Sequence, residues 1–217
     1  MSTRILCFVV FCSLLLCAGI TVDAAADEGF TPLLDSRTLK GWKVRSEKEA
    51  KPDEWTVEGG VLKAKAGNSW LATEKEYGDY ILQLEWRVPE NGNSGVFIRV
   101  PELKAGEHPW VKGIEIQVLD DRGPAYAGKL KPWQYSGSLY GAVAADQSAF
   151  AGSGKWNAFE ISCRGDLISV VLNGKEVAEG DMSQIEALKD RPRRGIIGLQ
   201  NHGTDAEFRN LRIKELK

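Results

Sequence analysis

The chain has 217 residues, 43% of them hydrophobic, and a formal net charge of −2. This length fits a single large all-β domain that buries a core of its own. A net charge so close to neutral argues against a basic surface that binds nucleic acid or an anionic membrane. Seven Trp and five Tyr residues supply flat faces, which either fill the core or contact sugar rings.

The first 26 residues have the features of a secretory signal peptide. Arg4 precedes an apolar run over residues 5–20, which is shorter than a comfortable membrane span, and an Ala-Ala-Ala cleavage site ends at Ala26. We therefore expect a secreted or periplasmic protein, cleaved near Ala26. Its mature domain covers residues 27–217 and is expected to have no membrane span.

Cysteine placement fits export without an internal disulfide. Cys7, Cys12 and Cys17 lie in the leader, so Cys163 alone remains and is expected to be a buried, unpaired side chain. Lipid attachment at Cys17 is the alternative to plain secretion. Leu16 disfavours it, because a lipoprotein signal carries a small residue at that position.

Short segments of alternating polarity follow the leader to the end of the chain. Gly59-Gly60 and Asn173-Gly174 are two-residue turn signals that close β-hairpins. Helix is expected only as a turn within residues 35–41 and a short segment at residues 182–188, and residues 121–134 are expected to form a long loop. Extended segments are expected at residues 55–64, 70–73, 80–88, 94–100, 113–120, 138–143, 155–163, 167–172, 195–201 and 207–216.

About a dozen short strands without βαβ alternation predict an all-β sandwich of two antiparallel sheets. The alternation also predicts which side chains fill the core. We expect burial of Trp86, Ile98, Ile116, Leu172 and Leu199.

The segments at residues 94–100 and 113–120 carry the strongest functional signal. Side chains alternate between the two faces of a sheet, so each segment has an aliphatic face and a second face of different chemistry. The second faces hold Gly95, Phe97 and Arg99 in one segment and Gly113, Glu115 and Gln117 in the other. Glycines beside aromatic, charged and amide side chains favour a floor on which a polar ligand lies. The same alternation places Gln200 and His202 on this face if Ile197 and Leu199 face the core.

Glu115 and Asp120 are candidates for an acid and a base. Glu115 and Gln117 share a face, whereas Asp120 joins them only if a bulge adds one residue to the strand. Two carboxylates on one strand supply a general acid and a general base. In the alternative interpretation Asp120 begins a turn and Glu115 pairs with Arg99.

The sequence contains two histidines, His108 and His202, and no CxxC, HExxH, GxSxG or P-loop motif. A Cys- and His-based zinc cluster is therefore not expected, and the identity of any metal is unknown. A carboxylate-and-histidine site for a harder divalent cation stays open. His202 is either a surface residue of a glycine loop or a member of the ligand face.

These residues lie in segments that resemble the 3-keto-disaccharide hydrolase domain, a secreted family first described as a domain of unknown function. The similarity covers almost all of the chain after the leader, in order. The matching segments are residues 30–35, 41–42, 93–99, 113–120, 137–141, 155–157, 172–174, 198–203 and 208–212.

The resemblance implies a concanavalin A-like jelly roll whose concave sheet binds sugar. It also implies cleavage of glycosides that are already oxidised at C3, by hydrolases or by lyases. The positions of this chain that match the family are Arg99, Glu115, Gln117, Asp120, Tyr140, Gln200 and His202.

A ketone at C3 acidifies the hydrogen at C2, so a base can remove it and the C1 leaving group departs by β-elimination. Water that adds back at C1 makes the overall result a hydrolysis. The chemistry needs a base, an electrophile at the C3 oxygen and an acid at the glycosidic oxygen. The candidates are Glu115 or His202 as base, Arg99 or a bound divalent cation as electrophile, Asp120 or Tyr140 at the leaving group, and Gln117, Gln200 and Phe97 as binding residues.

Two other functions stay open. One is a non-catalytic carbohydrate-binding jelly-roll module, because the fold alone does not decide activity. The other is a retaining glycosidase, because the strand resembles the Glu-x-Asp-x-x-Glu strand of laminarinase-like enzymes. Gln117 and Asp120 depart from that pattern, which weakens the glycosidase interpretation.

Overall fold

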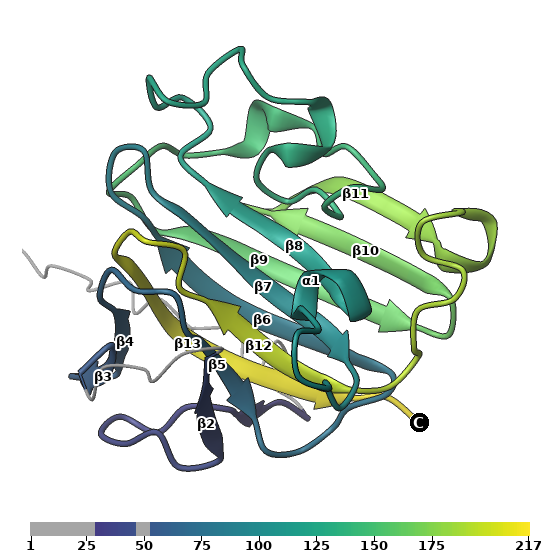
Figure 1. Cartoon of the computed structure of the whole chain (residues 1–217), viewed down its shortest axis with the longest axis horizontal. Helices are drawn as coiled ribbons and strands as arrows, with labels where there is room; N and C mark the ends of the chain where they lie inside the picture. The colour runs from purple at the N-terminus through teal and green to yellow at the C-terminus, as the bar shows by residue number, and fades with distance from the viewer. Residues whose placement is uncertain (1–28, 47–52) are drawn as a thin grey trace, which may run out of the picture.

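Two antiparallel sheets face each other in the computed structural model, which describes residues 29–46 and 53–217 (Figure 1). The larger sheet has the order β11 (Lys175–Asp181), β10 (Leu167–Leu172), β9 (Asn157–Arg164), β6 (Tyr80–Arg87), β13 (Ala206–Glu215), β4 (Val61–Ala64) and β3 (Trp55–Glu58), with β1 (Thr31–Pro32) also beside β13. The smaller sheet has the order β2 (Trp42–Arg45), β5 (Trp70–Thr73), β12 (Ile196–Gln200), β7 (Asn93–Val100) and β8 (Ile114–Leu119). The predicted leader lies outside the described residues.

Helix is confined to single turns in the part of the chain that the structure describes. These are α1 (Pro109–Lys112) and three 3₁₀ turns, η2 (Pro132–Gln134), η3 (Gln147–Ala149) and η4 (Met182–Gln184). None of the described helices is long and apolar enough to cross a membrane.

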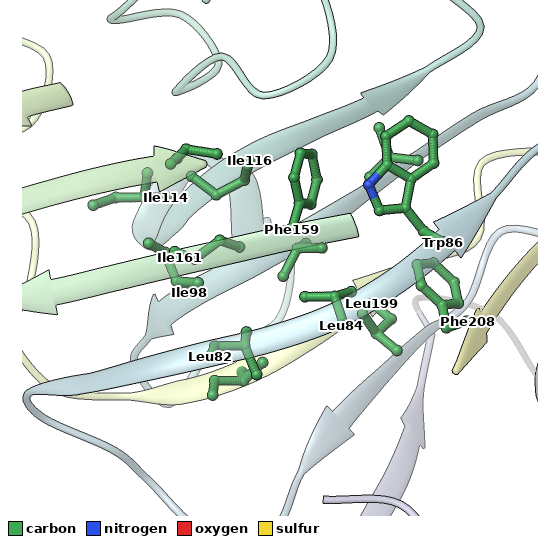
Figure 2. Close-up of a cluster of buried hydrophobic side chains, with 14 of the residues drawn as sticks. Leu82, Leu84, Trp86, Ile98, Ile114, Ile116, Phe159, Ile161, Leu199 and Phe208 are labelled. Carbon is green, nitrogen blue, oxygen red and sulfur yellow. The ribbon is translucent and has the colours of Figure 1, made fainter. Parts of the chain in front are cut away.

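The core lies between the two sheets, as Figure 2 shows. Strand β6 alternates buried and half-buried residues along its whole length, and its buried face packs toward the smaller sheet. The five predicted core residues, from Trp86 to Leu199, are all at most 1% exposed, which confirms the predicted alternation. The side chains that meet in this layer include Leu82, Leu84, Trp86, Phe159, Ile161 and Phe208 from the larger sheet and Ile98, Ile114, Ile116 and Leu199 from the smaller one.

Both predicted tight hairpins are present. Gly59-Gly60 joins β3 to β4 and Asn173-Gly174 joins β10 to β11, with φ angles of 58°, 79°, 52° and 82° in chain order. Two consecutive positive φ angles match the right-handed twist of the flanking strands, which is why glycine and asparagine occupy these positions.

Three of the segments expected from the sequence take another conformation, and α1, η2 and η3 form outside the residues where helix was expected. Asp35 accepts hydrogen bonds from the backbone N–H groups of Arg37 (2.7 Å) and Thr38 (2.5 Å), so a side-chain-stabilised turn replaces the expected helical turn. The expected helix at residues 182–188 is reduced to η4 and the turns that follow it. The expected strand at residues 138–143 folds back on itself, because Leu139 bridges both Ile116 and Val143.

Candidate functional site

The outward face of the smaller sheet collects most of the predicted site residues. Phe97 is paired with Glu115 on one side and with Gly198 on the other. Gly95 is paired with Gln117 in the same ladder. Residues paired across adjacent strands project to the same side, so these side chains lie on one face, opposite the core layer.

The strand next to β12 extends this face. Gln200 is paired with Trp70 of β5, so the two side chains share the same side of the sheet. The edge of the Trp70 ring meets Phe97, with ring centroids 5.8 Å apart and an interplanar angle of 84°. An aromatic floor therefore runs from β5 across to β7.

A groove of about 860 Å³ lies over this floor. The loop that leads into α1 forms one wall, and α1 itself lies in front of the smaller sheet in Figure 1. The volume is in the range of small-molecule sites in proteins. Residues that line the groove include Arg45, Trp70, Phe97, His108, Trp110, Gln200 and His202.

Two glycines make room for the larger side chains of this face. A Cβ atom on Gly95 would lie 2.4 Å from Glu115 Oε1, and one on Gly198 would lie 2.7 Å from Trp70 Cε3. Neither space can hold both a methyl group and the side chain that is there. The glycines thus permit the carboxyl group and the indole to lie flat against the strands.

Glu115 is the group whose electrostatics are most altered. Glu115 is only 5% exposed, and its carboxyl group has no hydrogen-bond or ion-pair partner among the described residues. Burial raises the pKa of Glu115 to about 8, because the ionised form loses hydration that nothing replaces. A carboxyl with such a pKa is a much stronger base than an ordinary glutamate.

Tyr140 lies beside Glu115. The Tyr140 N–H donates to the Glu115 carbonyl oxygen at 2.9 Å, and Leu139 is in the core, so alternation puts the Tyr140 side chain on the Glu115 face. The phenol oxygen accepts a hydrogen bond from Gln134 Nε2 at 3.1 Å, and the ring meets Trp133 edge-on with centroids 5.3 Å apart. A held phenol therefore lies on the same face as the unpaired carboxyl.

The groove contains polar atoms without partners. Arg45 Nε and Gln200 Oε1 are buried and make no hydrogen bond within the described residues. The Arg45 guanidinium carbon lies 5.7 Å from the centre of the Trp70 ring. Buried polar atoms are costly when unpaired, and both of these atoms belong to side chains that line the groove. Gln117 differs, since its Oε1 already accepts from the Val118 N–H at 2.9 Å.

His202 lies at the edge of the groove on the turn after β12. Its Nδ1 is 3.3 Å from Asn93 Nδ2, and its side chain is exposed. Asn201 holds this turn, because its side chain accepts from the Gly67 N–H (3.0 Å) and donates to the Lys65 carbonyl (2.6 Å). His202 and Glu115 therefore belong to the same sheet face, His202 near the start of β7 and Glu115 farther along it.

Arg99 does not lie on this face, and the expectation that it does is wrong. The register of β7 against β12 shifts so that two residues, Ile98 and Arg99, stand opposite Ile197 alone, and Arg99 has a φ of 53°. This β-bulge breaks the two-residue period and turns Arg99 inward. Its guanidinium is fully buried and donates to the Gly165 carbonyl (2.7 Å) and to Met182 Sδ (3.2 Å).

Asp120 is also separated from Glu115. The β7–β8 ladder has no register shift, so the bulge that would bring Asp120 to the groove is absent from this described ladder. Asp120 Oδ2 instead accepts from the Asn91 N–H at 2.9 Å, and its carbonyl accepts from the Gly123 N–H at 2.9 Å. The turn interpretation of Asp120 is the one that the structure shows, but the Glu115–Arg99 pair expected with it is not formed.

Sequence reasoning did not find Arg45, Trp70 and Trp110 and left His108 without a place. They come from an edge strand, a short central strand and an irregular loop, none of which carries a periodic signal. Asp121 was also missed. It is buried, accepts from the Ser136 N–H at 2.9 Å, and has a pKa raised by burial to about 6, but it does not line the groove.

The described residues contain no group of three or more His, Cys, Asp or Glu side chains that could hold a metal ion. A divalent cation at this site would need ligands from the substrate or from fewer protein side chains.

Fold and groove together define a jelly-roll domain with an aromatic and polar groove on one sheet. Residues 29–214 match the model of the family described as the 3-keto-alpha-glucoside-1,2-lyase-like domain. The chain belongs to this family, and the resemblance seen in the sequence is confirmed.

Individual relatives agree with this assignment. A protein of Bacteroides thetaiotaomicron described as a 3-keto-disaccharide hydrolase is 29% identical over 239 residues, which cover 91% of this chain and 81% of the relative. A crystallised protein of Parabacteroides distasonis, provisionally named a glycosyl hydrolase, is 30% identical with a TM-score of 0.73, covering 86% of this chain and 99% of its own.

A carbohydrate-binding module of Bacillus subtilis, CBM66, superimposes with a TM-score of 0.56 at 13% identity, covering 85% of this chain and 100% of its own. At that identity the likeness shows the fold alone, and it confirms the predicted jelly-roll sandwich.

Proposed function

We propose that this protein is an enzyme that cleaves 3-keto-glycosides, 3-keto-disaccharides among them, through removal of the C2 proton and β-elimination at C1. The family and the description of the Bacteroides relative support a substrate of this class. The observation that carries the proposal is the buried, unpartnered carboxyl group of Glu115, which does not itself line the groove but is paired across the strands with Phe97, which does.

Glu115 is the base in this mechanism. Its carboxylate takes the C2 proton, and the C–H electron pair forms a C2–C3 double bond with negative charge on the C3 oxygen. The electron pair on the C3 oxygen then re-forms the ketone. The electrons of the C2–C3 double bond shift to form a C1–C2 double bond, and the C1–O bond breaks with its electrons on the leaving oxygen. The products are an unsaturated 3-keto sugar and an alcohol. A base with a pKa of about 8 is well matched to a weakly acidic C–H at neutral pH.

The other roles follow from the outward face of the smaller sheet and from the groove on it. Tyr140, next to Glu115, protonates the leaving oxygen. Asp120 is no longer a candidate for this role, because its carboxylate is held in a turn by the Asn91 N–H. With Arg99 in the core, we assign His202 to the C3 oxygen, where a donor stabilises the developing charge. Gln200 and Gln117 bind hydroxyl groups, and Phe97 and Trp70 form the floor. Addition of water across the C1–C2 bond converts the elimination into the hydrolysis for which the Bacteroides relative is described.

The test compares a glucoside with its 3-keto derivative, each incubated with wild-type protein and with Glu115→Gln, in the presence and absence of EDTA. We expect turnover of the keto sugar alone by the wild type and none by the variant, because the amide cannot accept the C2 proton. In deuterium oxide, exchange of the C2 hydrogen before cleavage is the signature of proton removal. Turnover of both sugars would identify an ordinary glycosidase instead, and binding without turnover would identify a carbohydrate-binding module. Loss of turnover with EDTA would add a metal to the mechanism.

A further inference from the structure

The 3₁₀ turn η2 holds the Tyr140 side chain at two points. Trp133 of this turn meets the Tyr140 ring edge-on, with centroids 5.3 Å apart and an interplanar angle of 81°. Gln134, the last residue of the turn, donates from Nε2 to the phenol oxygen at 3.1 Å. The Gln134 N–H closes the turn by donating to the Lys131 carbonyl oxygen at 2.9 Å, and Pro132 at its first position fixes the φ angle that such a turn needs. Both the ring and the hydroxyl group of Tyr140 therefore contact a closed turn.

The orientation of the Gln134 amide group follows from its second hydrogen bond. Gln134 Oε1 accepts from the Lys131 backbone N–H at 3.0 Å. A backbone N–H is only a donor, so the amide atom that it contacts must be the oxygen, and the NH₂ group must face Tyr140. An amide NH₂ group is also only a donor. The phenol oxygen of Tyr140 is thus the acceptor in its bond with Gln134.

The phenol proton of Tyr140 is not used in this contact. A phenol has one O–H donor and acceptor lone pairs, and the Gln134 amide occupies a lone pair. Among the described residues, no group accepts the Tyr140 O–H proton. Tyr140 is half-buried, and its backbone N–H donates to the Glu115 carbonyl oxygen at 2.9 Å. The phenol can therefore donate its proton to a ligand at this face of the sheet.

We infer that Gln134 is a positioning residue that fixes the hydrogen-bond polarity of Tyr140 and so keeps the phenol proton available to the oxygen that leaves C1. The inference rests on the proposed function for the identity of this acceptor. In the cleavage step the C1–O electron pair passes to the leaving oxygen, which takes the Tyr140 proton and becomes an alcohol. The Gln134 N–H then donates to the phenolate, and a hydrogen bond to a charged oxygen is stronger than one to a neutral oxygen. Glu115 releases the C2 proton to solvent and solvent reprotonates Tyr140, so the protons balance over one turnover.

Gln134→Glu tests the polarity because it changes little besides the donor. The new carboxylate has nearly the same size, can still accept from the Lys131 N–H, and presents a second acceptor to Tyr140. The phenol then donates to the protein, and its proton is no longer available to the leaving oxygen. Gln184→Glu is the matched control. Gln184 is also the last residue of a 3₁₀ turn, η4, but it is exposed and donates to Ser183 Oγ at 2.9 Å.

The kinetic test measures three rates for each variant: exchange of the C2 hydrogen in deuterium oxide, cleavage of methyl 3-keto-glucoside, and cleavage of p-nitrophenyl 3-keto-glucoside. Nitrophenolate leaves without a proton, whereas methoxide needs one. We expect Gln134→Glu to lower kcat for the methyl glycoside about 100-fold and to keep the other two rates within about threefold of wild type. Tyr140→Phe should show the same pattern, and the double variant should lose no more than either single variant. Equal losses in all three rates, or no loss on the methyl glycoside, would overturn the inference.

A spectroscopic measurement tests the polarity without turnover. The intensity ratio of the tyrosine ring doublet in the Raman spectrum reports whether a phenol accepts or donates its hydrogen bonds, and subtraction of the Tyr140→Phe spectrum isolates Tyr140. We expect the ratio to move toward that of a strong donor in Gln134→Glu and to keep its wild-type value in Gln184→Glu. This result supports the polarity assignment even if the wild type cleaves no 3-keto-glycoside, an outcome that would refute the proposed function. An unchanged ratio in Gln134→Glu would overturn the role of Gln134.

Discussion

Glu115 Oε1 occupies the space directly against Gly95 of the neighbouring strand, where a Cβ atom would lie only 2.4 Å away. The backbone of β7 therefore fixes the position of the carboxyl group that we assign as the base. Since no hydrogen bond from the described residues holds this carboxyl, the fit against Gly95 is what positions it.

Gly95→Ala should displace Glu115 and lower kcat/KM on a 3-keto-glycoside about 100-fold, because misplacement of a catalytic group by about 1 Å has an effect of that size. Gly78→Ala is the control, since its Cβ would meet only Arg194 Nη1, at 3.6 Å. Steady-state kinetics of both variants checks this. Wild-type kinetics for Gly95→Ala would show that Glu115 can move aside without consequence for the reaction.

The stability of the protein should fall as the pH rises toward 8. The Glu115 carboxyl ionises near 4.5 in the unfolded chain but near pH 8 in the folded one, so between these values the folded state holds the extra proton. A rise in pH then favours unfolding. Glu115→Gln stays neutral and lacks this penalty. Urea unfolding measures this at pH 5 and pH 9. The free energy of unfolding of the variant, relative to that of the wild type, should be higher at pH 9 than at pH 5 by a few kcal/mol. Glu186→Gln, whose side chain is 87% exposed, should show no such trend, and a pH-independent difference for Glu115→Gln would contradict a raised pKa.

The pH dependence of turnover should report the same group. If the Glu115 carboxylate removes the C2 proton, kcat/KM rises with pH and levels off above about 8, because only the ionised form is a base. A profile that falls through pH 8 would instead make the protonated Glu115 a general acid. Profiles measured from pH 5 to 10 in constant ionic strength distinguish the two.

Substitutions at Arg99 and at His202 should have opposite effects: the first should lower stability, and the second should lower activity. Arg99 is buried against Gly165 and Met182, so Arg99→Lys should lower the free energy of unfolding by about 2 kcal/mol while the folded protein keeps its kcat. His202 is exposed, so His202→Ala should change stability by less than about 0.5 kcal/mol while turnover is lost. Urea unfolding and kinetics on both variants provide the comparison. The reverse pattern would return Arg99 to the site.

Export is a further proposal, which depends on residues outside the described ones. We expect protein recovered from the periplasm or medium to begin near Asp27, because residues 24–26 form the cleavage site. Intact-mass analysis measures this directly. A full-length mass would contradict cleavage, and a lipid adduct on Cys17 would replace secretion by anchoring.

The sequence by itself determined the layers of this protein. In β6 apolar and polar side chains alternate from Tyr80 to Trp86, because one face of the strand packs on the other sheet. This alternation can be read directly from the sequence. The hairpin at Asn173-Gly174 is equally local, since its positive φ angles are ones that these two residues adopt readily. The placement of Glu115, Gln117 and Phe97 on one face follows from the same period.

The tertiary structure alone decided the features that depend on contacts between different strands and loops. Arg99 turns inward because β7 takes an extra residue against β12, and bulges depend on the partner strand, which alternation within one segment does not reveal. The pKa of Glu115 and the closeness of Trp110 to the groove likewise depend on burial and packing between segments that are distant in sequence. Local pattern fixes which way a side chain points along a regular strand, whereas its neighbours, and hence its chemistry, come from contacts that form only on folding.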